Sequence, residues 1–428
     1  MMDGMSVTPA GRKPIISAAD FDLSDHDFWA RPMSEREHAF QLLRGLDRPA
    51  FYEEREISFA PKGPGYHALV KHADILEVSR NAEVFCSGDG GATNIPDMPP
   101  EFTEYFGSMI NMDDPRHARL RRIVSRAFTP RMIGRFEADV DAAAARIVDD
   151  LIARGPGCDF VTEVAARLPL KIICDMMGIP EKDYDVIFDR SNVIIGGFDP
   201  EYGGDDMTTV AEKLLAAGME LQHLVQDLAA HRVEHPANDL VSSLVNANID
   251  GERLTAQELG SFFILLVVAG NETTRNAISY GLRLFTRNPG QRALLLEDLD
   301  GRLPGTVEEI VRLASPVNFM RRKVTRDHEM NGRLYRRGQK VVLYYWAANR
   351  DETVFPDPLR FDITRSPNPH VGYGGPGPHF CLGAHLARRE ITAMFRELLR
   401  RLPRIEGGAP ERLHSSFING IKHMSCEF

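Results

Sequence analysis

Cysteine is scarce in this chain of 428 residues, and its spacing gives no sign of pairing. The five cysteines are Cys86, Cys158, Cys174, Cys381 and Cys426. An odd number of scattered cysteines excludes the disulfide framework of a small secreted domain. No C-x-x-C pair of the kind that usually binds zinc occurs. We therefore expect a protein of the reducing cytoplasm.

Long apolar runs and an excess of basic residues are also missing. The longest clearly apolar run, Phe262–Ala269, is too short to span a bilayer, and residues 1–15 lack the apolar core of a signal peptide. The 61 acidic and 51 basic residues give a net charge of −10, which disfavours nucleic acid as the main partner. These absences predict a globular protein with no membrane anchor and with a flexible stretch over residues 1–20.

What the chain does contain is an unusual loop at residues 370–383, which reads HVGYGGPGPHFCLG. Its glycines lack a Cβ and would let the backbone approach a large flat ligand. A predicted helix begins just after Cys381, so its positive end favours a thiolate at that sulfur. A lone cysteine is more often simply packed in a core, and His379 with Cys381 would also permit zinc. The glycine density favours a single thiolate ligand to haem iron.

A second signal is a long predicted helix whose character changes midway. It opens with a capping box at Thr255–Glu258 and is apolar nearly all round over Phe262–Ala269. Glu272 and Thr273 follow, and buried polar groups are costly without a partner or a use. In one interpretation, Thr273 bonds back to the carbonyl one turn before it. In the other, Glu272 and Thr273 are a catalytic pair.

A third signal is the arginine-rich segment 113–131, where a helix is predicted from Pro115. His117 and Arg121 are four residues apart, so they share one helix face. This face is either solvated, a nucleic-acid patch that the net charge argues against, or a carboxylate site, which an arginine fork suits.

Together these segments resemble the cytochrome P450 family, whose haem loop usually reads Phe-Gly-x-Gly-x-His/Arg-x-Cys-x-Gly. The matching positions are Gly375, Gly377, His379, Cys381 and Gly383. Gly374 stands where the family has an aromatic residue, and Tyr373 is the nearest aromatic. The resemblance implies a mainly α fold with small β-sheets (α+β), formed as one domain over residues 1–428. Haem b would lie between the long central helix and the helix behind Cys381, whose sulfur would bind the iron.

The resemblance also assigns roles to the other motifs. Glu272 and Thr273 match the family's Ala/Gly-Gly-x-Asp/Glu-Thr signature, in which the threonine bonds dioxygen and the acid relays protons. His117 and Arg121 match its His-x-x-x-Arg helix and would bind the haem propionates. Arg321 would make the third propionate contact, unless its neighbour Arg322 takes that place.

A structural ion pair is implied by Glu309 and Arg312, which match the family's Glu-x-x-Arg. The third member is predicted to be Arg360, ahead of Arg350. Glu309 also completes a possible capping box with Thr306, which would be an ordinary helix role.

Within the family, the likeness is greatest to the mycobacterial methyl-branched-lipid ω-hydroxylases, over residues 104–110, 171–180, 261–278 and 368–391. It implies a monooxygenase that hydroxylates the terminal carbon of methyl-branched or isoprenoid lipids with O₂. Electrons would come from a ferredoxin and its reductase. The loop 196–204 would act as a lid. Residues expected at the substrate pocket are Phe106, Ile110, Val267, Val268, Ala269, Val317, Phe319, Met320, Phe417 and Ile418.

Other functions stay open. A sterol side-chain or terpenoid hydroxylase would share every motif. A haem-thiolate sensor or binding protein would keep Cys381 but would not need Glu272 and Thr273. A haem isomerase or peroxide-driven enzyme often alters the position of Thr273.

Overall fold

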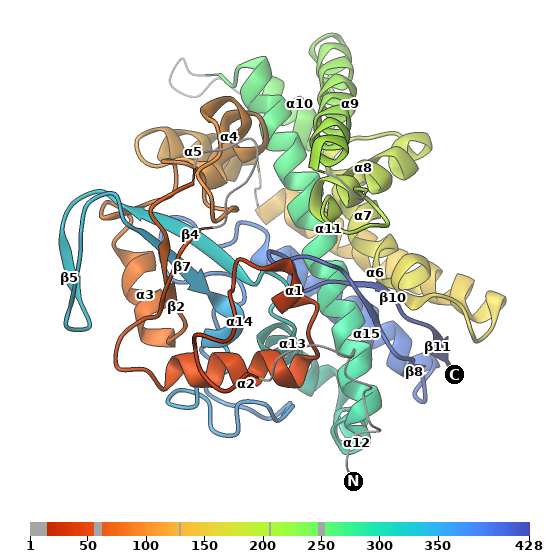
Figure 1. The fold of residues 1–428 in the computed structure, drawn as a ribbon. Helices are drawn as coiled ribbons and strands as arrows, with labels where there is room; N and C mark the ends of the chain where they lie inside the picture. Colours follow the sequence, from red (N-terminus) through yellow and green to blue (C-terminus); the bar gives the residue numbers. More distant parts are fainter. Residues whose placement is uncertain (1–14, 55–61, 128–129, 205–206, 247–252) are drawn as a thin grey trace.

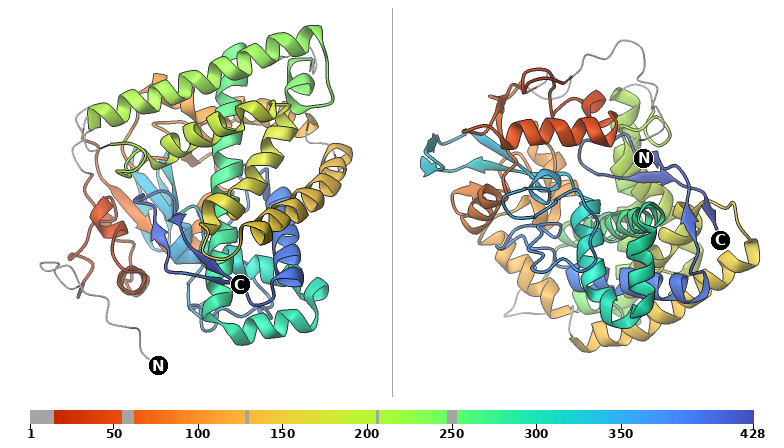
Figure 2. Two further views of the ribbon diagram at one scale, coloured as in Figure 1. Left: turned by 90° about the vertical axis from the view of Figure 1, so that its right-hand side faces the viewer. Right: turned by 90° about the horizontal axis from the view of Figure 1, so that it is seen from below.

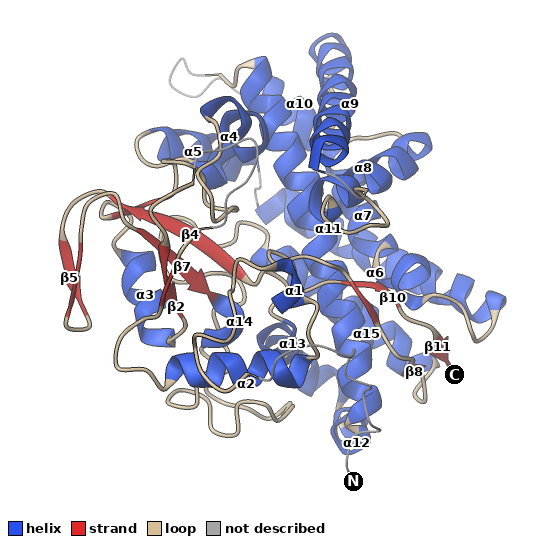
Figure 3. Cartoon of the chain, in the orientation of Figure 1, coloured by secondary structure: helices blue, strands red, loops and turns tan. Residues whose placement is uncertain are grey.

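The computed structural model describes residues 15–54, 62–127, 130–204, 207–246 and 253–428. Most of the stretch predicted to be flexible, residues 1–20, lies outside the described residues. The fold is mainly helical with small sheets, as predicted, and it has a helix-rich part and a smaller part that contains the main sheet (Figures 1 and 3). None of the described helices has both the length and the apolar character needed to cross a membrane.

Five strands form the main sheet, in the order β1-β2-β7-β4-β3. They are β1 (Phe51–Tyr52), β2 (Tyr66–Leu69), β3 (Phe85–Cys86), β4 (Phe319–Val324) and β7 (Lys340–Tyr344). Only β2 and β7 pair in parallel, and the other neighbours are antiparallel. The sheet thus joins segments from both ends of the sequence.

The remaining described strands form three antiparallel pairs. They are β5 (His328–Met330) with β6 (Arg333–Tyr335), β8 (Glu406–Gly407) with β11 (Cys426–Glu427), and β9 (Glu411–Arg412) with β10 (Ile421–His423). The β5–β6 hairpin turns at Asn331 and Gly332, as predicted, because both residues adopt the positive φ that such a tight turn requires.

Four helices lie close to the main sheet: α1 (His26–Trp29), α2 (Met33–Arg44), α3 (His72–Arg80) and α14 (Tyr345–Ala348). Aromatic rings join the first two to the sheet. Phe40 packs within 5.5 Å of the Tyr344 ring and within 5.3 Å of the Trp346 ring. This aromatic core fixes the first described segments of the chain on one side of the molecule.

The helix-rich part is organised around α11 (Ala256–Arg287), which runs through its middle (Figures 1 and 2). The predicted capping box is present, because Thr255 accepts from the Glu258 amide while Glu258 accepts from the Thr255 amide. Packed against α11 are α4 (Pro100–Gly107), α7 (Arg167–Met177), α8 (Tyr184–Gly196), α9 (Met207–Glu234), α13 (Leu299–Ala314) and α15 (Ala384–Arg401).

The other helices surround this group. They are α5 (Arg116–Ala127), α6 (Pro130–Arg154), α10 (Leu240–Val245), α12 (Pro289–Glu297) and the short turns η1 (Ser108–Asn111), η2 (Val161–Ala165) and η3 (Glu181–Asp183). The first half of α11 is buried in one apolar core, around Phe263, and the second half in another, around Phe285. The polar stretch of α11 lies between these two cores.

Candidate active site

The loop before Cys381 is held against α3 by two of its glycines. A Cβ on Gly375 would collide with the Ser79 side chain, and a Cβ on Gly377 would collide with the Ser79 carbonyl. Gly377 also has a φ of 155°, which other residues rarely adopt. At these two positions the missing side chains let the loop approach α3.

Cys381 opens onto an internal cavity between α11 and α15, and its amide donates to the carbonyl of Tyr373 at 3.0 Å. Burial raises the pKa of its thiol, although the amides of Gly383 and Ala384 and the charge of Arg121 act to lower it. The amides at the start of the helix thus act in the expected direction, but burial outweighs them, and the pKa of the free thiol is raised above its ordinary value. A metal ion bonded to the sulfur would displace the proton outright.

One wall of this cavity carries four basic side chains: His117, Arg121, Arg322 and His379. The ring centroids of His117 and His379 are 4.3 Å apart. His117 is buried, and its Nε2 has no hydrogen-bond partner among the described residues. Burial and the nearby charge of Arg322 lower the pKa of His379 to about 2, so its ring is neutral. The wall suits an anionic group, since two guanidinium groups and an unpartnered imidazole nitrogen meet there.

Arg321 does not reach this wall, and its assignment as an anion contact is wrong. Its guanidinium is buried on the other side of β4, where it pairs with Asp97 at 2.5 Å and donates to the Gly91 carbonyl at 2.7 Å. Consecutive side chains of a strand face opposite sides, so Arg322 faces the cavity. Of the two arginines that the sequence left open, the structure places Arg322 at the site.

Thr273 lines the cavity, and its hydroxyl donates to the Ala269 carbonyl at 2.8 Å. The ordinary back-bond is therefore present. Glu272 is only 1% exposed and does not line the cavity. Its carboxylate forms an ion pair with Arg275, which also donates to Asn192 of α8 at 2.9 Å. The acid of the predicted pair thus lies on the α8 side of the helix.

The cavity face of α11 differs from the predicted one. Its residues recur at spacings of three and four: Phe262, Leu265, Leu266, Ala269, Gly270, Thr273, Thr274 and Ala277. Val267 is fully buried in the core with α7 and α9, and Val268 packs against the same core. Both predictions are wrong because their side chains project from other faces of the helix. Counting back two turns from Thr273 would have selected Leu265 and Leu266.

Of the eight other residues expected to contact substrate, four line the cavity and four do not. Ile110, Ala269, Val317 and Met320 line the cavity. Four do not: Phe106 packs on Phe102 and Tyr105, Phe319 and Phe417 pack on each other at 5.6 Å, and Ile418 is buried opposite Val317. Apolar lining residues missed by the sequence include Met109, Pro169, Ile173, Phe262, Leu265, Leu266, Pro316, Leu382 and Leu386. They come from several separate segments, which no local pattern connects.

Glu390 is a further residue that the sequence did not reveal. It is buried on α15 and is the only acid among the described residues that line the cavity. Burial raises its pKa to about 8, and the Thr274 side chain is hydrogen-bonded to it. The carboxyl is therefore neutral at pH 7 and leaves the charge of the basic wall unbalanced.

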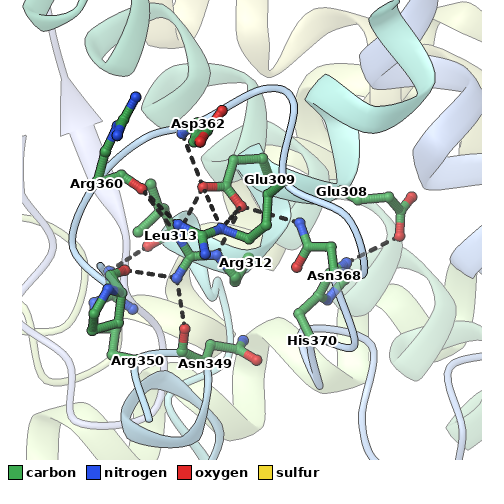
Figure 4. Close-up of polar contacts among 12 residues, drawn as sticks. Glu308, Glu309, Arg312, Leu313, Asn349, Arg350, Arg360, Asp362, Asn368 and His370 are labelled. Carbon is green, nitrogen blue, oxygen red and sulfur yellow. Dashed lines mark hydrogen bonds and ion pairs between the residues drawn. The ribbon is translucent and has the colours of Figure 1, made fainter. Parts of the chain in front are cut away.

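Glu309 and Arg312 form a fully buried pair in which two guanidinium nitrogens each lie 2.8 Å from a carboxylate oxygen (Figure 4). Arg360 is exposed and contributes only its carbonyl, so its prediction as third member is wrong. Arg365 takes that place, with Nε 3.2 Å from Glu309. Thr306 lies inside α13, which is capped by Asp298, so the possible capping box does not form.

The adjacent Glu308 joins α13 to the cysteine loop. It accepts from Arg388 of α15 at 2.6 Å and contacts His370 at 3.0 Å. Although burial alone would raise the pKa of Glu308, these bonds hold it at about 2. The Arg388 guanidinium in turn lies 4.2 Å from the centre of the Tyr373 ring. Tyr373, the displaced aromatic residue, is thus part of the support behind Cys381.

A single cysteine facing an apolar cavity with a basic wall defines a haem-thiolate protein. The family model for Cytochrome P450 matches residues 219–412. The chain is 48% identical over 412 residues to the methyl-branched lipid omega-hydroxylase of Mycobacterium tuberculosis, covering 96% of this chain and 95% of that protein. It is 43% identical over 370 residues to a steroid C26-monooxygenase of Mycolicibacterium smegmatis, covering 85% and 84%.

Solved structures agree. A cytochrome P450 of Mycobacterium marinum in complex with pseudoionone superposes with a TM-score of 0.90 at 42% identity, covering 99% of this chain and 100% of that one. The chain therefore belongs to the cytochrome P450 family, and its activity is that of a monooxygenase. Its cofactor is haem b, which fits a single cysteine that lines a cavity whose basic wall includes the unpartnered Nε2 of His117.

Proposed function

We propose that this protein hydroxylates the terminal (ω) carbon of a methyl-branched or isoprenoid-type lipid. The observation that carries this proposal is the apolar wall built by η1, α7 and α11, which includes Ile110, Ile173 and Leu266. Among the described lining residues, the basic and acidic side chains are confined to the basic wall and Glu390. The names of the mycobacterial relatives support the same substrate class.

The basic wall and Cys381 together hold the cofactor in this proposal. Cys381 binds the iron, while His117, Arg121 and Arg322 bind the propionates, with His379 stacked beside them. Haem supplies the activation of O₂ when it is bound. The neutral Glu390 does not oppose the propionates, because its proton is retained up to about pH 8.

The substrate enters with its apolar end first. Burying a chain gains roughly 0.8 kcal/mol per CH₂, which favours a long lipid in such a cavity. The polar head stays near the loop 196–204 and solvent, because the apolar wall offers no cation to it. Methyl branches fix the chain end in one orientation, which selects a terminal C–H bond that is intrinsically hard to oxidise.

Thr273 and Glu272 handle protons in this proposal. Thr273 lines the cavity, and its hydroxyl can leave the Ala269 carbonyl to hold a proton for oxygen bound there. Glu272 receives protons on the α8 side of the helix and passes them on when its contact with Arg275 changes.

Electrons come from a ferredoxin and its reductase, and the protein acts in the cytoplasm. Arg116 and Arg122 are exposed on α5, and Phe380 beside Cys381 is 40% exposed. A basic surface near the cysteine would attract an acidic ferredoxin despite the negative net charge.

The test compares a terminally methyl-branched fatty acid with the straight-chain acid of equal chain length. With a surrogate ferredoxin system, we expect faster turnover of the branched acid and a hydroxyl group only at its terminus, located by mass spectrometry. The Cys381→Ser variant is the control and should give no product. Oxidation spread along the chain, or preference for the straight acid, would overturn the proposal.

A steroid with a branched side chain is the second candidate, because steroid C26-monooxygenases are 40–43% identical to this chain. Competition in the same assay separates the two. A steroid that displaces the branched acid and is hydroxylated faster would favour this candidate.

A further inference from the structure

Two of the four cysteines away from the haem lie against each other. The Sγ atoms of Cys158 and Cys426 are 3.6 Å apart, which is van der Waals contact. Cys158 lies in the segment between α6 and η2, and Cys426 lies in β11 (Figure 1). Neither residue lines the haem cavity, so neither has a role in the proposed function.

The backbone places these two cysteines opposite each other. Asp159 and Ser425 form an antiparallel bridge, and the Cys426 amide donates to the Cys158 carbonyl at 3.1 Å. Hydrogen-bonded residues on opposed antiparallel strands have Cα atoms about 5.5 Å apart, which lies within the range that disulfides span. The two sulfurs are already 3.6 Å apart, so forming the bond requires them to approach by roughly 1.6 Å.

The surroundings keep the two segments together. On the Cys158 side, Asp159 is hydrogen-bonded to the His423 ring at 2.6 Å. Gly157, which precedes Cys158, donates from its amide to the Cys426 carbonyl at 2.7 Å. These contacts hold Cys426 and the residues just before it against the segment that contains Cys158.

We propose that Cys158 and Cys426 form a disulfide when the protein meets hydrogen peroxide. One thiol is first oxidised to a sulfenic acid as the peroxide is reduced to water. The second thiol then attacks that sulfur, which forms the S–S bond and releases a second water molecule. Two thiols and one peroxide thus give one disulfide and two waters, and a thiol reductant reverses the change.

The two cysteines take different parts in this sequence. Cys426 is fully buried, and burial raises the pKa of its thiol, with Cys158, Glu427 and Asp159 acting in the same direction. Cys158 is only partly buried. Cys158 therefore meets the peroxide, and Cys426 resolves the sulfenic acid.

The bond would close a loop between residues 268 positions apart, which strongly restricts the unfolded chain. It would also fasten β11 and the neighbouring His423, whose ring contacts Glu201 in the loop 196–204. The oxidised protein should therefore be more stable, with its last strands locked in place.

The experiment treats the haem-loaded protein with a small excess of hydrogen peroxide, blocks free thiols under denaturing conditions and maps the peptides by mass spectrometry. We expect one linked peptide pair containing Cys158 and Cys426, lost on reduction. The melting temperature should rise by about 5 °C on oxidation. The Cys158→Ser variant should lose both effects, and Cys426→Ala should repeat that loss.

Cys174→Ser is the matched control, because Cys174 is buried alone in α7 and should leave the linked pair unchanged. Linkage through Cys86 or Cys174, or oxidation of Cys158 to the sulfinic acid without any linkage in the wild type, would overturn the proposal.

Discussion

Thr273 shows how one side chain can satisfy the helix and still serve the cavity. A threonine hydroxyl carries one proton and two lone pairs, and only the proton is used by the Ala269 carbonyl at 2.8 Å. The back-bond is therefore weak and local, and it can be exchanged for a partner in the cavity at little cost. The two interpretations of Thr273 that the sequence offers are compatible, and the structure shows the first.

Replacing Thr273 with alanine tests the second interpretation, in which Thr273 has a catalytic role. We expect Thr273→Ala to keep haem and substrate binding, because the removed groups are small, but to divert reducing equivalents to peroxide. Product formed per NADPH consumed should fall several-fold, whereas Thr273→Ser, which keeps the hydroxyl, should retain most of the coupling. Unchanged coupling in the alanine variant would remove Thr273 from the proton path.

Single residues were predictable where a motif is tied to one chemistry. Cys381, His117, Arg121 and Thr273 were placed at the cavity from sequence alone, because their types and spacings belong together. The choice between Arg321 and Arg322 was not predictable. It depends on which side of β4 faces the cavity, and that side is determined by its pairing with β3 and β7.

At the scale of elements, α11 shows both the strength and the limit of pattern reading. Its start was predicted to the residue, because the capping box is a local signal. Its cavity face was predicted wrongly at Val267 and Val268, because an apolar stretch gives no indication of which side meets ligand and which meets protein. The residues that complete the cavity, and those that complete the apolar core behind α11, come from helices distant in sequence.

Substitutions at two neighbouring residues distinguish the cavity face of α11 from its core face. Leu266→Ala should enlarge the cavity, weaken lipid binding several-fold and spread the position of hydroxylation, with little loss of stability. Val267→Ala should lower the free energy of unfolding by about 1–3 kcal/mol, because it leaves a void in a closed core, and should leave the product unchanged. Spectral titration, product analysis and urea unfolding of both variants make the comparison.

The assignment of these faces would be contradicted if Val267→Ala changed the site of hydroxylation while Leu266→Ala did not.

At the scale of the whole molecule, the cysteine loop joins the two parts of the fold. Gly375 and Gly377 let it pack on Ser79 of α3, which lies beside the main sheet. His370 contacts Glu308 of α13, and the Tyr373 ring lies under Arg388 of α15, which ties the loop to the helices. Cys381 is therefore positioned from both sides. The sequence predicted the loop but not this arrangement, since nothing local connects Ser79 with Gly375.

A double-variant experiment tests this joint. Gly375→Ala should lower haem occupancy, because its Cβ collides with the Ser79 side chain, and adding Ser79→Gly should restore it. Gly377→Ala should also lower occupancy, but Ser79→Gly should not rescue it, because the collision there is with the backbone carbonyl and φ is unfavourable. The ratio of Soret to protein absorbance measures occupancy. Equal rescue of both variants would contradict the geometry.

The contact between the cysteine loop and α3 also bears on how the protein matures. A chain whose helices had formed before the sheet docked would possess the iron ligand without its final position. We therefore expect haem binding to depend on the docking of α3 (His72–Arg80) against the loop 370–383. The Soret absorbance would then report on completed folding. Destabilising α3 should lower this absorbance under conditions in which α11 is still folded.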